Sequence, residues 1–329
     1  MSLTSLNQLL HLLADGHFHS GTDLGERLHM TRAAVWKQLQ GIEQLGVQVH
    51  RVRGKGYRIP AGLDLLDLEA IIRHQPQLAK LFAMELLMST ASTNQVLMQR
   101  QNEGSIHGKV VFAEVQTAGR GRLGRQWQSP FAQQLAVSVG WQFDGGVAAL
   151  EGLSLVVGLA VVDALQALGV QGAGVKWPND ILLNGKKLAG ILLELSGDAT
   201  GPCQVVIGIG LNVHLARCDL IDQPWTSLVD AGYTIERNML AAQLLIALSE
   251  RLNCFATSGF AELQQAWQAQ HVYQGQQVRL HGVKEEITGI CHGVDASGAL
   301  LLEVAGQLQS FRGGEVSLRP LATTSGGNS

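Results

Sequence analysis

The stretch Gln116-Thr117-Ala118-Gly119-Arg120-Gly121-Arg122-Leu123-Gly124-Arg125-Gln126-Trp127 places three glycines and three arginines within seven residues. Glycine adopts backbone conformations closed to other residues and lets N–H groups approach a ligand. Arginine adds a permanent positive charge and a planar fork that suits phosphate or carboxylate. The stretch therefore predicts a loop that closes over a compact anionic ligand. A solvated linker and a basic patch for nucleic acid are the alternatives, because a glycine-rich match alone is weak.

The length and composition predict a folded multidomain protein. A chain of 329 residues can hold two or three domains of about 100–200 residues each. Its 46% hydrophobic and 16% charged residues are typical of a compact chain rather than a disordered one. The net charge is −3, yet residues 31–58 hold six basic side chains against one acidic side chain, Glu43. These residues predict a local basic face near the N-terminus.

The cysteines and the apolar segments bear on the compartment. Cys203, Cys218, Cys254 and Cys291 lie far apart without a CxxC pair, which predicts free thiols rather than a disulfide framework or a zinc site. The N-terminus lacks the pattern of a secretion signal. The apolar run 153–162 is shorter than the ~20 residues that cross a bilayer. We expect a cytoplasmic protein with no metal site of its own and no membrane partner.

The first sixty residues predict three helices. Leucines at positions 3, 6, 10 and 13 recur at helical spacing, and a short second helix is expected over 22–28. Thr31 is a candidate N-cap for a third helix that begins at Arg32. In that helix Val35, Leu39 and Ile42 share one face, which predicts a buried side opposite a basic exposed side.

A basic hairpin is expected directly after these helices. Two short strand-like segments, 47–52 and 57–59, flank Arg53-Gly54-Lys55-Gly56. Three helices and a basic hairpin predict a winged helix-turn-helix over residues 1–60, whose third helix enters the major groove while the wing meets phosphates. The candidate DNA-binding residues are Thr22, Arg32, Ala33, Trp36, Lys37, Arg53 and Lys55. A protein-interaction module is the alternative, and Trp36 can equally pack against its own domain.

Residues 67–270 predict an α+β domain in which strand-like and helical segments alternate. Apolar strands are expected at 109–114 and 135–141, and an apolar helix at 150–168. Ser92, Thr93 and Asn94 open another helix, where hydroxyls and free N–H groups can hold a polar ligand. A plain helix cap is the alternative for these three residues.

Three further segments place polar residues at the ends of strands. Lys176-Trp177-Pro178-Asn179-Asp180 follows one strand, and VVIGIGLN (205–212) is a buried strand that ends in Asn212. Lys187 precedes the apolar strand 188–193. An ammonium group fixed there can neutralise a carboxylate and stabilise charge that develops during phosphoryl or acyl transfer. A solvated surface lysine is the alternative.

Together, GRGRLGRQW, KWPND, KLAGIL and GIGLN, in this order, resemble the biotin–protein ligases, over about residues 3–319. With the winged helix, the resemblance is to the members of that family that also repress the biotin operon. It implies a class II synthetase-like ligase domain that joins biotin and ATP, with Mg²⁺, into biotinyl-5′-AMP. Biotin would then pass to a lysine of the biotin carboxyl carrier protein of acetyl-CoA carboxylase. The resemblance further implies biotin operator DNA, biotinyl-5′-AMP as corepressor and a ligand-promoted homodimer.

The resemblance also implies residue roles. The head group of biotin would meet Ser92, Thr93, Asn94 and Gln116. The loop residues Gly119, Arg120, Gly121 and Arg122 would cover biotin and the adenylate, and Lys187, near Gly190, would contact the biotin carboxylate. The KWPND residues are Lys176, Asn179 and Asp180, and the catalytic candidates are Lys187, Arg122, Lys176 and Asp180. The nucleotide would lie near Asn212, Trp225, Arg237, Asn238 and Arg319.

Leu123 departs from the family pattern, because many repressor-type relatives carry a basic residue there, and it leaves the strength of the homodimer open. Short strand signals predict a small β-domain over 271–319, SH3-like by resemblance, and 320–329 is expected to be a disordered tail. A non-catalytic, ligand-sensing repressor and a lipoate-type ligase are the alternative functions.

Overall fold

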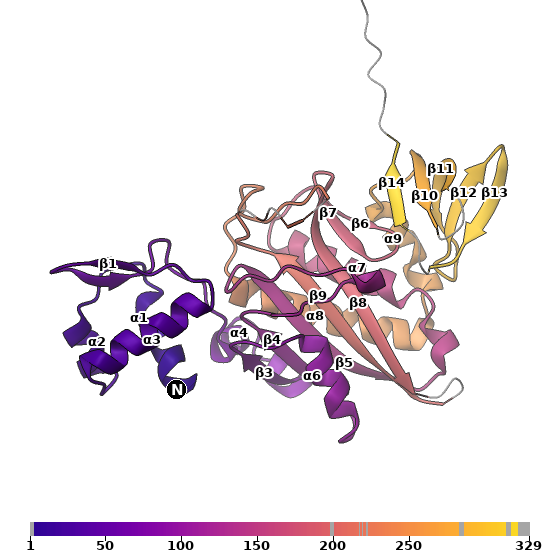
Figure 1. Cartoon of the computed structure of the whole chain (residues 1–329). Helices are drawn as coiled ribbons and strands as arrows, with labels where there is room; N and C mark the ends of the chain where they lie inside the picture. Colours follow the sequence, from indigo (N-terminus) through magenta and orange to yellow (C-terminus); the bar gives the residue numbers. More distant parts are fainter. Residues whose placement is uncertain are drawn as a thin grey trace, which may run out of the picture.

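The chain folds into an N-terminal helical domain with a hairpin, a central body built on one large sheet, and a small C-terminal sheet (Figure 1). The computed structural model describes residues 3–197, 201–216, 218, 220–221, 223–282, 286–313 and 317–321. Most of the expected tail lies outside the described residues. The expected α+β multidomain class, with an N-terminal winged helix-turn-helix, is confirmed.

The N-terminal domain has the expected three helices and wing. Its elements are α1 (Leu3–Leu13), α2 (Gly21–Arg27), α3 (Arg32–Gln44), β1 (His50–Val52) and β2 (Gly56–Arg58). Thr31 caps α3, since its Oγ1 accepts a hydrogen bond from Ala34 N at 3.2 Å. The first strand starts later than expected, because Val47 and Val49 pack into the domain core instead of pairing.

Among the described residues, the central sheet has the strand order β3-β4-β5-β9-β8-β7-β6, parallel between β3 and β4 and antiparallel elsewhere. The strands are β3 (Ala83–Leu87), β4 (Lys109–Ala113), β5 (Gln134–Phe143), β6 (Ala173–Lys176), β7 (Asp180–Leu183), β8 (Lys186–Gly197) and β9 (Cys203–Asn212). The KWPND segment is thus the tight turn between β6 and β7.

Alternation along the central strands gives the sheet two different faces. Val137, Ile207 and Ile209 join the main apolar core, which contains residues of α7 (Leu153–Ala167) and α8 (Arg237–Ser258). The other face carries Ser138 and Gly208, which pair across β5 and β9, and α6 (Thr93–Gln101) lies on it. The remaining helices of the body are α4 (Leu68–His74), α5 (Leu78–Leu81) and α9 (Gln264–Gln270), with short 3-10 turns η1 (Arg122–Gly124), η2 (Val147–Leu150) and η3 (Ala261–Leu263).

Within the described part of the chain, α8 is the one helix that is long and apolar enough, by length and composition, to cross a membrane. In this fold α8 is a core helix. It packs against α7, and most of its apolar side chains are buried between α7, α4 and the sheet.

The C-terminal domain is an antiparallel sheet in the order β13-β12-β11-β10-β14 among the described residues. Its strands are β10 (Gln277–His281), β11 (Glu286–Val294), β12 (Leu300–Val304), β13 (Gln307–Phe311) and β14 (Ser317–Pro320). Four of them match the expected strands, and β14 was not expected. The buried apolar residues of this sheet belong to the main core, and Trp177 Nε1 donates to Gly298 O at 3.1 Å. The sheet is therefore packed firmly on the central body.

The linker between the first two domains is held by the start of α8. The Arg237 side chain is fully buried, and its guanidinium pairs with Glu114 at 2.7 Å and donates to Asp64 O at 2.6 Å. Asn238 Nδ2 donates to Leu65 O at 2.9 Å. The side chains of Arg237 and Asn238 contact the linker, Glu114 and Gln134 O, and the expectation that both residues contact the nucleotide stays a prediction. A buried guanidinium needs such an anion and carbonyl oxygens close by.

We expect Arg237→Met to lower the free energy of unfolding by about 3–5 kcal/mol, because it leaves Glu114 as a buried, unpaired charge. Urea-induced unfolding measures the loss. Arg251→Met is the matched control, since Arg251 lies on the same helix and pairs with Asp163 at 2.7 Å at a partly exposed site. Such exposed pairs contribute below about 1 kcal/mol. Equal losses in the two variants would contradict the anchoring role.

His271 predicts a pH dependence of stability. Its ring stacks on Trp267 with centroids 4.5 Å apart, and burial lowers its pKa to about 4. The unfolded chain takes up this proton near pH 6.5, so stability falls as the pH drops from 6.5 toward 4, by about 3 kcal/mol in total. Unfolding midpoints at pH 7 and pH 4.5 measure it. His271→Phe should remove this part of the pH dependence, and an unchanged dependence would refute the assignment.

Candidate active site

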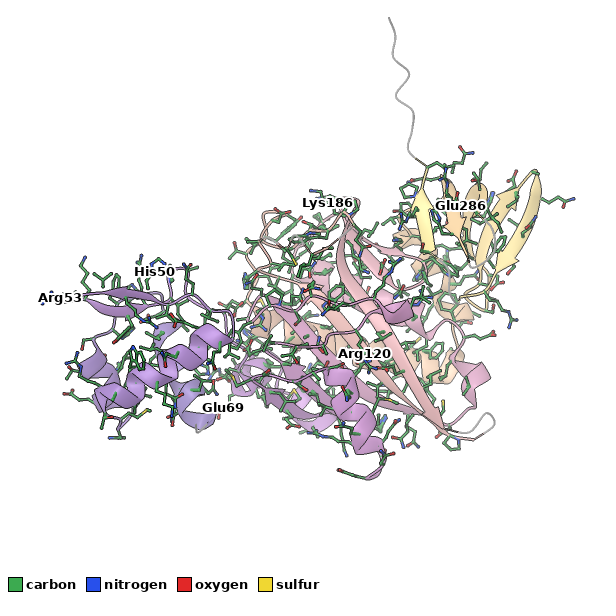
Figure 2. The ribbon with its side chains drawn as sticks, in the orientation of Figure 1. His50, Arg53, Glu69, Arg120, Lys186 and Glu286 are labelled. Atoms are coloured by element: carbon green, nitrogen blue, oxygen red, sulfur yellow. The ribbon has the colours of Figure 1, made fainter. Side chains whose placement is uncertain are left out.

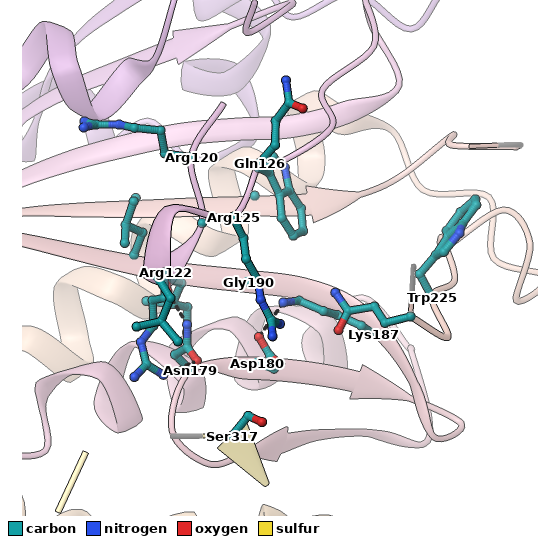
Figure 3. A pocket seen from close by; sticks show the side chains of 18 of the residues that line it. Arg120, Arg122, Arg125, Gln126, Asn179, Asp180, Lys187, Gly190, Trp225 and Ser317 are labelled. Carbon is teal, nitrogen blue, oxygen red and sulfur yellow. Dashed lines mark hydrogen bonds and ion pairs between the residues drawn. The ribbon is translucent and has the colours of Figure 1, made fainter. Parts of the chain in front are cut away.

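A cleft of about 480 Å³ opens on the α6 face of the central sheet (Figure 3). The start of α6, the Gly/Arg loop, the β6–β7 turn, the segment 220–225 and the edge of the C-terminal sheet line it. Fifteen of the expected ligand or catalytic residues line this cleft: Ser92, Thr93, Asn94, Gln116, Arg120, Gly121, Arg122, Lys176, Asn179, Asp180, Lys187, Gly190, Asn212, Trp225 and Arg319. The cleft lining does not include Gly119, Arg237 or Asn238.

The Gly/Arg loop is a folded arch rather than an extended linker. Gly121 N donates to Arg125 O at 2.7 Å, and Trp127 N donates to Gly119 O at 2.9 Å. Gly119 therefore closes the base of the arch behind the cleft wall. Leu123 lies at its tip with φ 58° and ψ 34°, and its side chain is 53% exposed. A left-handed conformation is unusual for a residue other than glycine, so the tip is tightly specified by the backbone around it.

Glycines make the floor of the cleft flat enough for an indole ring. Gly190 of β8 and Gly210 of β9 lie opposite each other, and a Cβ atom on Gly210 would come within 2.5 Å of Trp127. Trp127 Nε1 donates to Gln134 Oε1 at 2.9 Å, and Gln134 Nε2 donates to Asn212 Oδ1 at 2.7 Å. The GIGLN motif thus supplies both the space for Trp127 and the amide that fixes it through Gln134. The sequence interpretation assigned no role to Trp127 or Gln134.

Asp180 lies between two lysines at the other side of this ring. Its Oδ1 is 2.7 Å from Lys187 Nζ, and its Oδ2 is 3.2 Å from Lys176 Nζ. Burial alone would raise the pKa of Asp180, but the two ammonium groups outweigh it and hold that pKa below its ordinary value. Burial also lowers the pKa of the Lys176 ammonium group, against the effect of Asp180. The three groups form one tightly coupled ionic cluster in a half-buried site.

Cations predominate around this cluster. Among the described lining residues, Asp180 carries the one carboxylate, and six residues are cationic: Arg120, Arg122, Arg125, Lys176, Lys187 and Arg319. Figure 3 shows Arg125 pointing toward Lys187 and Asp180. Arg125 was given no role from the sequence, although its position as the third arginine of the Gly/Arg loop could have indicated a place in the cleft. Such an excess of positive charge in a cleft favours a polyanionic ligand.

Lys187 reaches the cleft because β8 carries a bulge. Asp180 pairs with Gly190 and Ile181 with Ala189, but Leu182 pairs with Lys187, so Leu188 is an extra residue. Strict alternation from Gly190 would have turned Lys186 toward the cleft and Lys187 away from it. A bulge re-aims the side chains that follow it, and here it brings the Lys187 ammonium group to Asp180.

The start of α6 forms the polar end of the cleft. Ser92 stands at the N-cap position, yet its side chain makes no capping hydrogen bond, so a plain cap does not describe it. Thr93 N donates to Gln116 Oε1 at 2.9 Å. Both N–H donors of the Asn94 side chain are used inside the protein, by Glu194 Oε2 at 2.7 Å and by Leu192 O at 3.3 Å.

The residues expected to bind DNA are all exposed on the N-terminal domain. They are Thr22 on α2, Arg32, Ala33, Trp36 and Lys37 on α3, and Arg53 and Lys55 in the wing turn. Trp36 is 48% exposed, so about half of its surface is open to a partner. Figure 2 shows Arg53 at the outer end of the wing, away from the central body.

Three known families match the chain. Residues 5–58 match the HTH domain, 86–212 the biotin/lipoate A/B protein ligase family, and 273–319 the biotin protein ligase C terminal domain. The bifunctional ligase/repressor BirA of Salmonella typhimurium is 44% identical over 94% of this chain and 96% of its own length. The corresponding protein of Escherichia coli is 41% identical over 95% of this chain and 96% of its own length. The biotin protein ligase from Aquifex aeolicus, in complex with biotin and ATP, matches with 30% identity and a TM-score of 0.62, over 72% of this chain and 99% of that one.

Proposed function

We propose how the cleft works from the premise that this chain belongs to the biotin protein ligase family. The chain is an ATP-dependent biotin–protein ligase and a DNA-binding repressor. As a ligase it joins biotin and ATP into biotinyl-5′-AMP and then passes biotin to a carboxyl carrier protein. As a repressor it binds operator DNA through its winged helix.

We assign the biotin site from the order of polar, aromatic and cationic side chains along the cleft. Biotin has a neutral ureido head, an apolar tail and a carboxylate. Thr93, which is buried, and Gln116, which is half-buried, offer polar groups at one end, and Lys187 Nζ lies 5.6 Å from the centre of the Trp127 ring. We assign the head to Thr93, Gln116 and Ser92, the tail to the face of Trp127, and the carboxylate to Lys187.

The cationic cluster offsets the repulsion between the two reactants. The biotin carboxylate attacks the α-phosphorus of ATP, and pyrophosphate leaves. Both reactants are anionic, so Lys187, Lys176 and Arg122 lower the energy of bringing them together and of the charge that develops on the phosphate oxygens. Asp180 pairs with both ammonium groups and holds them in place. Asn212, Trp225 and Arg319 line the same cleft and are proposed to contact the nucleotide.

The loop and the metal ion complete the proposal. An arch of glycine and arginine can close over the acyl-adenylate and shield it from water until the carrier lysine arrives.

In the described part of the chain no group of three or more His, Cys, Asp or Glu could hold a metal ion, and Asp180 is paired with two lysines. Mg²⁺ is therefore proposed to enter with the phosphates of ATP.

We also propose domain limits, a homodimer and a location in the cell. We assign the DNA-binding domain to 1–60, the ligase domain to 67–270 and the C-terminal domain to 271–319, in agreement with the ends of the secondary-structure elements. A ligand-promoted homodimer is proposed, with the exposed tip at Leu123 near its contact. A cytoplasmic location suits the four free cysteines.

Lys187→Ala tests the ligase assignment. Removing one ammonium group that stabilises the developing charge should slow pyrophosphate release from biotin and ATP by about 100- to 1,000-fold. Lys186→Ala is the matched control, because the neighbouring Lys186 is exposed (Figure 2) and exposed charges contribute little. Pyrophosphate release that is equal in the two variants would remove Lys187 from the reaction.

Paired substitution of Arg32 and Lys37 by alanine tests the DNA-binding surface. Each lost phosphate contact should weaken binding to the operator of the biotin operon and reduce the slope of affinity against salt by about 1. Fluorescence anisotropy at several salt concentrations measures both. Lys80→Ala, which removes an exposed cation from the central body, is the control. An unchanged salt slope in the paired variant would place the DNA elsewhere.

A further inference from the structure

Three neighbouring strands, β5, β9 and β8, form the surface on which the Asn94 side chain packs at the polar end of the cleft. Ser138, Gly208 and Leu192 stand in one row, because Gly208 pairs with Ser138 on β5 and with Leu192 on β8. A Cβ atom on Gly208 would collide with the Asn94 amide. Asn94 therefore lies flat across the row, with Ser138 at one end and Leu192 at the other.

Two acceptors fix which way this amide points, Leu192 O and the carboxylate of Glu194, and Glu194 makes the shorter hydrogen bond. Asn94 Nδ2 donates to Glu194 Oε2 at 2.7 Å, and a carboxylate can only accept. Asn94 Oδ1 must then face Ser138, whose Oγ is 2.5 Å away. Since Oδ1 only accepts, the single hydroxyl proton of Ser138 is committed to Asn94.

The next hydrogen bond of this chain lies at the wall of the cleft, between Ser138 and Thr93. The Thr93 hydroxyl group has two acceptors inside the protein, because Ser138 Oγ lies 2.7 Å and Gln116 Oε1 3.2 Å from Thr93 Oγ1. Since the Ser138 proton is committed to Asn94, the Thr93 proton is donated to these two protein acceptors. Gln116 Oε1 accepts from Thr93 N at 2.9 Å. The Thr93 hydroxyl oxygen thus keeps its acceptor lone pairs for a ligand. A chain of hydrogen bonds with one direction runs from Glu194 to the surface that meets the ligand.

We propose that Glu194 is a positioning residue for biotin recognition: it sets the direction of the Asn94–Ser138–Thr93 hydrogen bonds so that Thr93 presents an acceptor to an N–H of the ureido head. The inference rests on the proposed placement of the head. Glu194 does not line the main cleft, and its other partner is Arg120 of the loop, at 3.0 Å. Figure 3 shows Arg120 directed away from Lys187 and Asp180, so this pair ties the loop to β8 and stands apart from the cationic cluster.

Glu194→Gln tests the proposal, because the amide is nearly isosteric but can present an N–H donor to Asn94 where the carboxylate can only accept. We expect biotin to bind about 10-fold more weakly, while the KM for ATP changes by less than about twofold. Glu85→Gln is the matched control, since Glu85 also pairs with an arginine, Arg100, and has no contact with Asn94. Calorimetric titration with biotin and pyrophosphate-release kinetics supply the two readouts, and thermal unfolding checks the fold.

A double-mutant cycle with Ser138→Ala separates the hydrogen-bond chain from the Arg120 pair. In the Ser138→Ala background the effect of Glu194→Gln on biotin affinity should shrink to less than about twofold. Equal effects in both backgrounds, unchanged biotin affinity in Glu194→Gln, or equal weakening of biotin and ATP would each overturn the proposal. Gln116→Ala tests the placement of the head group separately. If this variant binds biotin normally, the placement fails whatever Glu194 does.

Discussion

The ion pairs of Asp180 with Lys187 and Lys176 are the interaction on which the rest of the site depends. Two ammonium groups in a half-buried cleft repel each other, and the carboxylate between them offsets both that repulsion and the cost of burial. Oxygen-to-nitrogen distances of 2.7 and 3.2 Å fix the lysines where two anionic reactants must meet. The β6–β7 turn and the bulge in β8 bring these three side chains together.

The sheet contributes by having one face for packing and one for ligand. Apolar residues fill the face toward α7 and α8. Small residues on the other face let Trp127 lie on Gly210 and Asn94 on Gly208. Polar groups behind them, Gln134 and Ser138, hold these two side chains by hydrogen bonds. The backbone O of Gln134 also accepts from Arg237 Nε at 2.9 Å. Gln134 therefore connects the cleft to Arg237, which holds the linker to the DNA-binding domain.

Local signals predicted much of this from the sequence, and non-local geometry accounts for what they missed. The Thr31 cap and the leucines of the first helix act within one or two turns, so their pattern is visible in the chain. The bulge at Leu188 depends on pairing with β7, and alternation alone would have chosen Lys186. The resemblance placed Arg237 near the nucleotide, whereas its buried contacts with Asp64 and Glu114 were not predicted because these partners are distant in sequence. The motif residues gather in one cleft, yet Arg125, Trp127 and Gln134 acquire their place only when the arch folds over the sheet.

The central claim is that this cleft activates biotin, with its polar end shaped for a ureido head. Pyrophosphate release measured with ATP and, in turn, biotin, lipoate and octanoate tests it most directly, because the three acids share a carboxylate and an apolar tail but differ in the head. The account predicts release with biotin and little with the other two acids at equal concentration. Release with lipoate or octanoate at a rate that matches biotin would show that the polar end does not select the ligand.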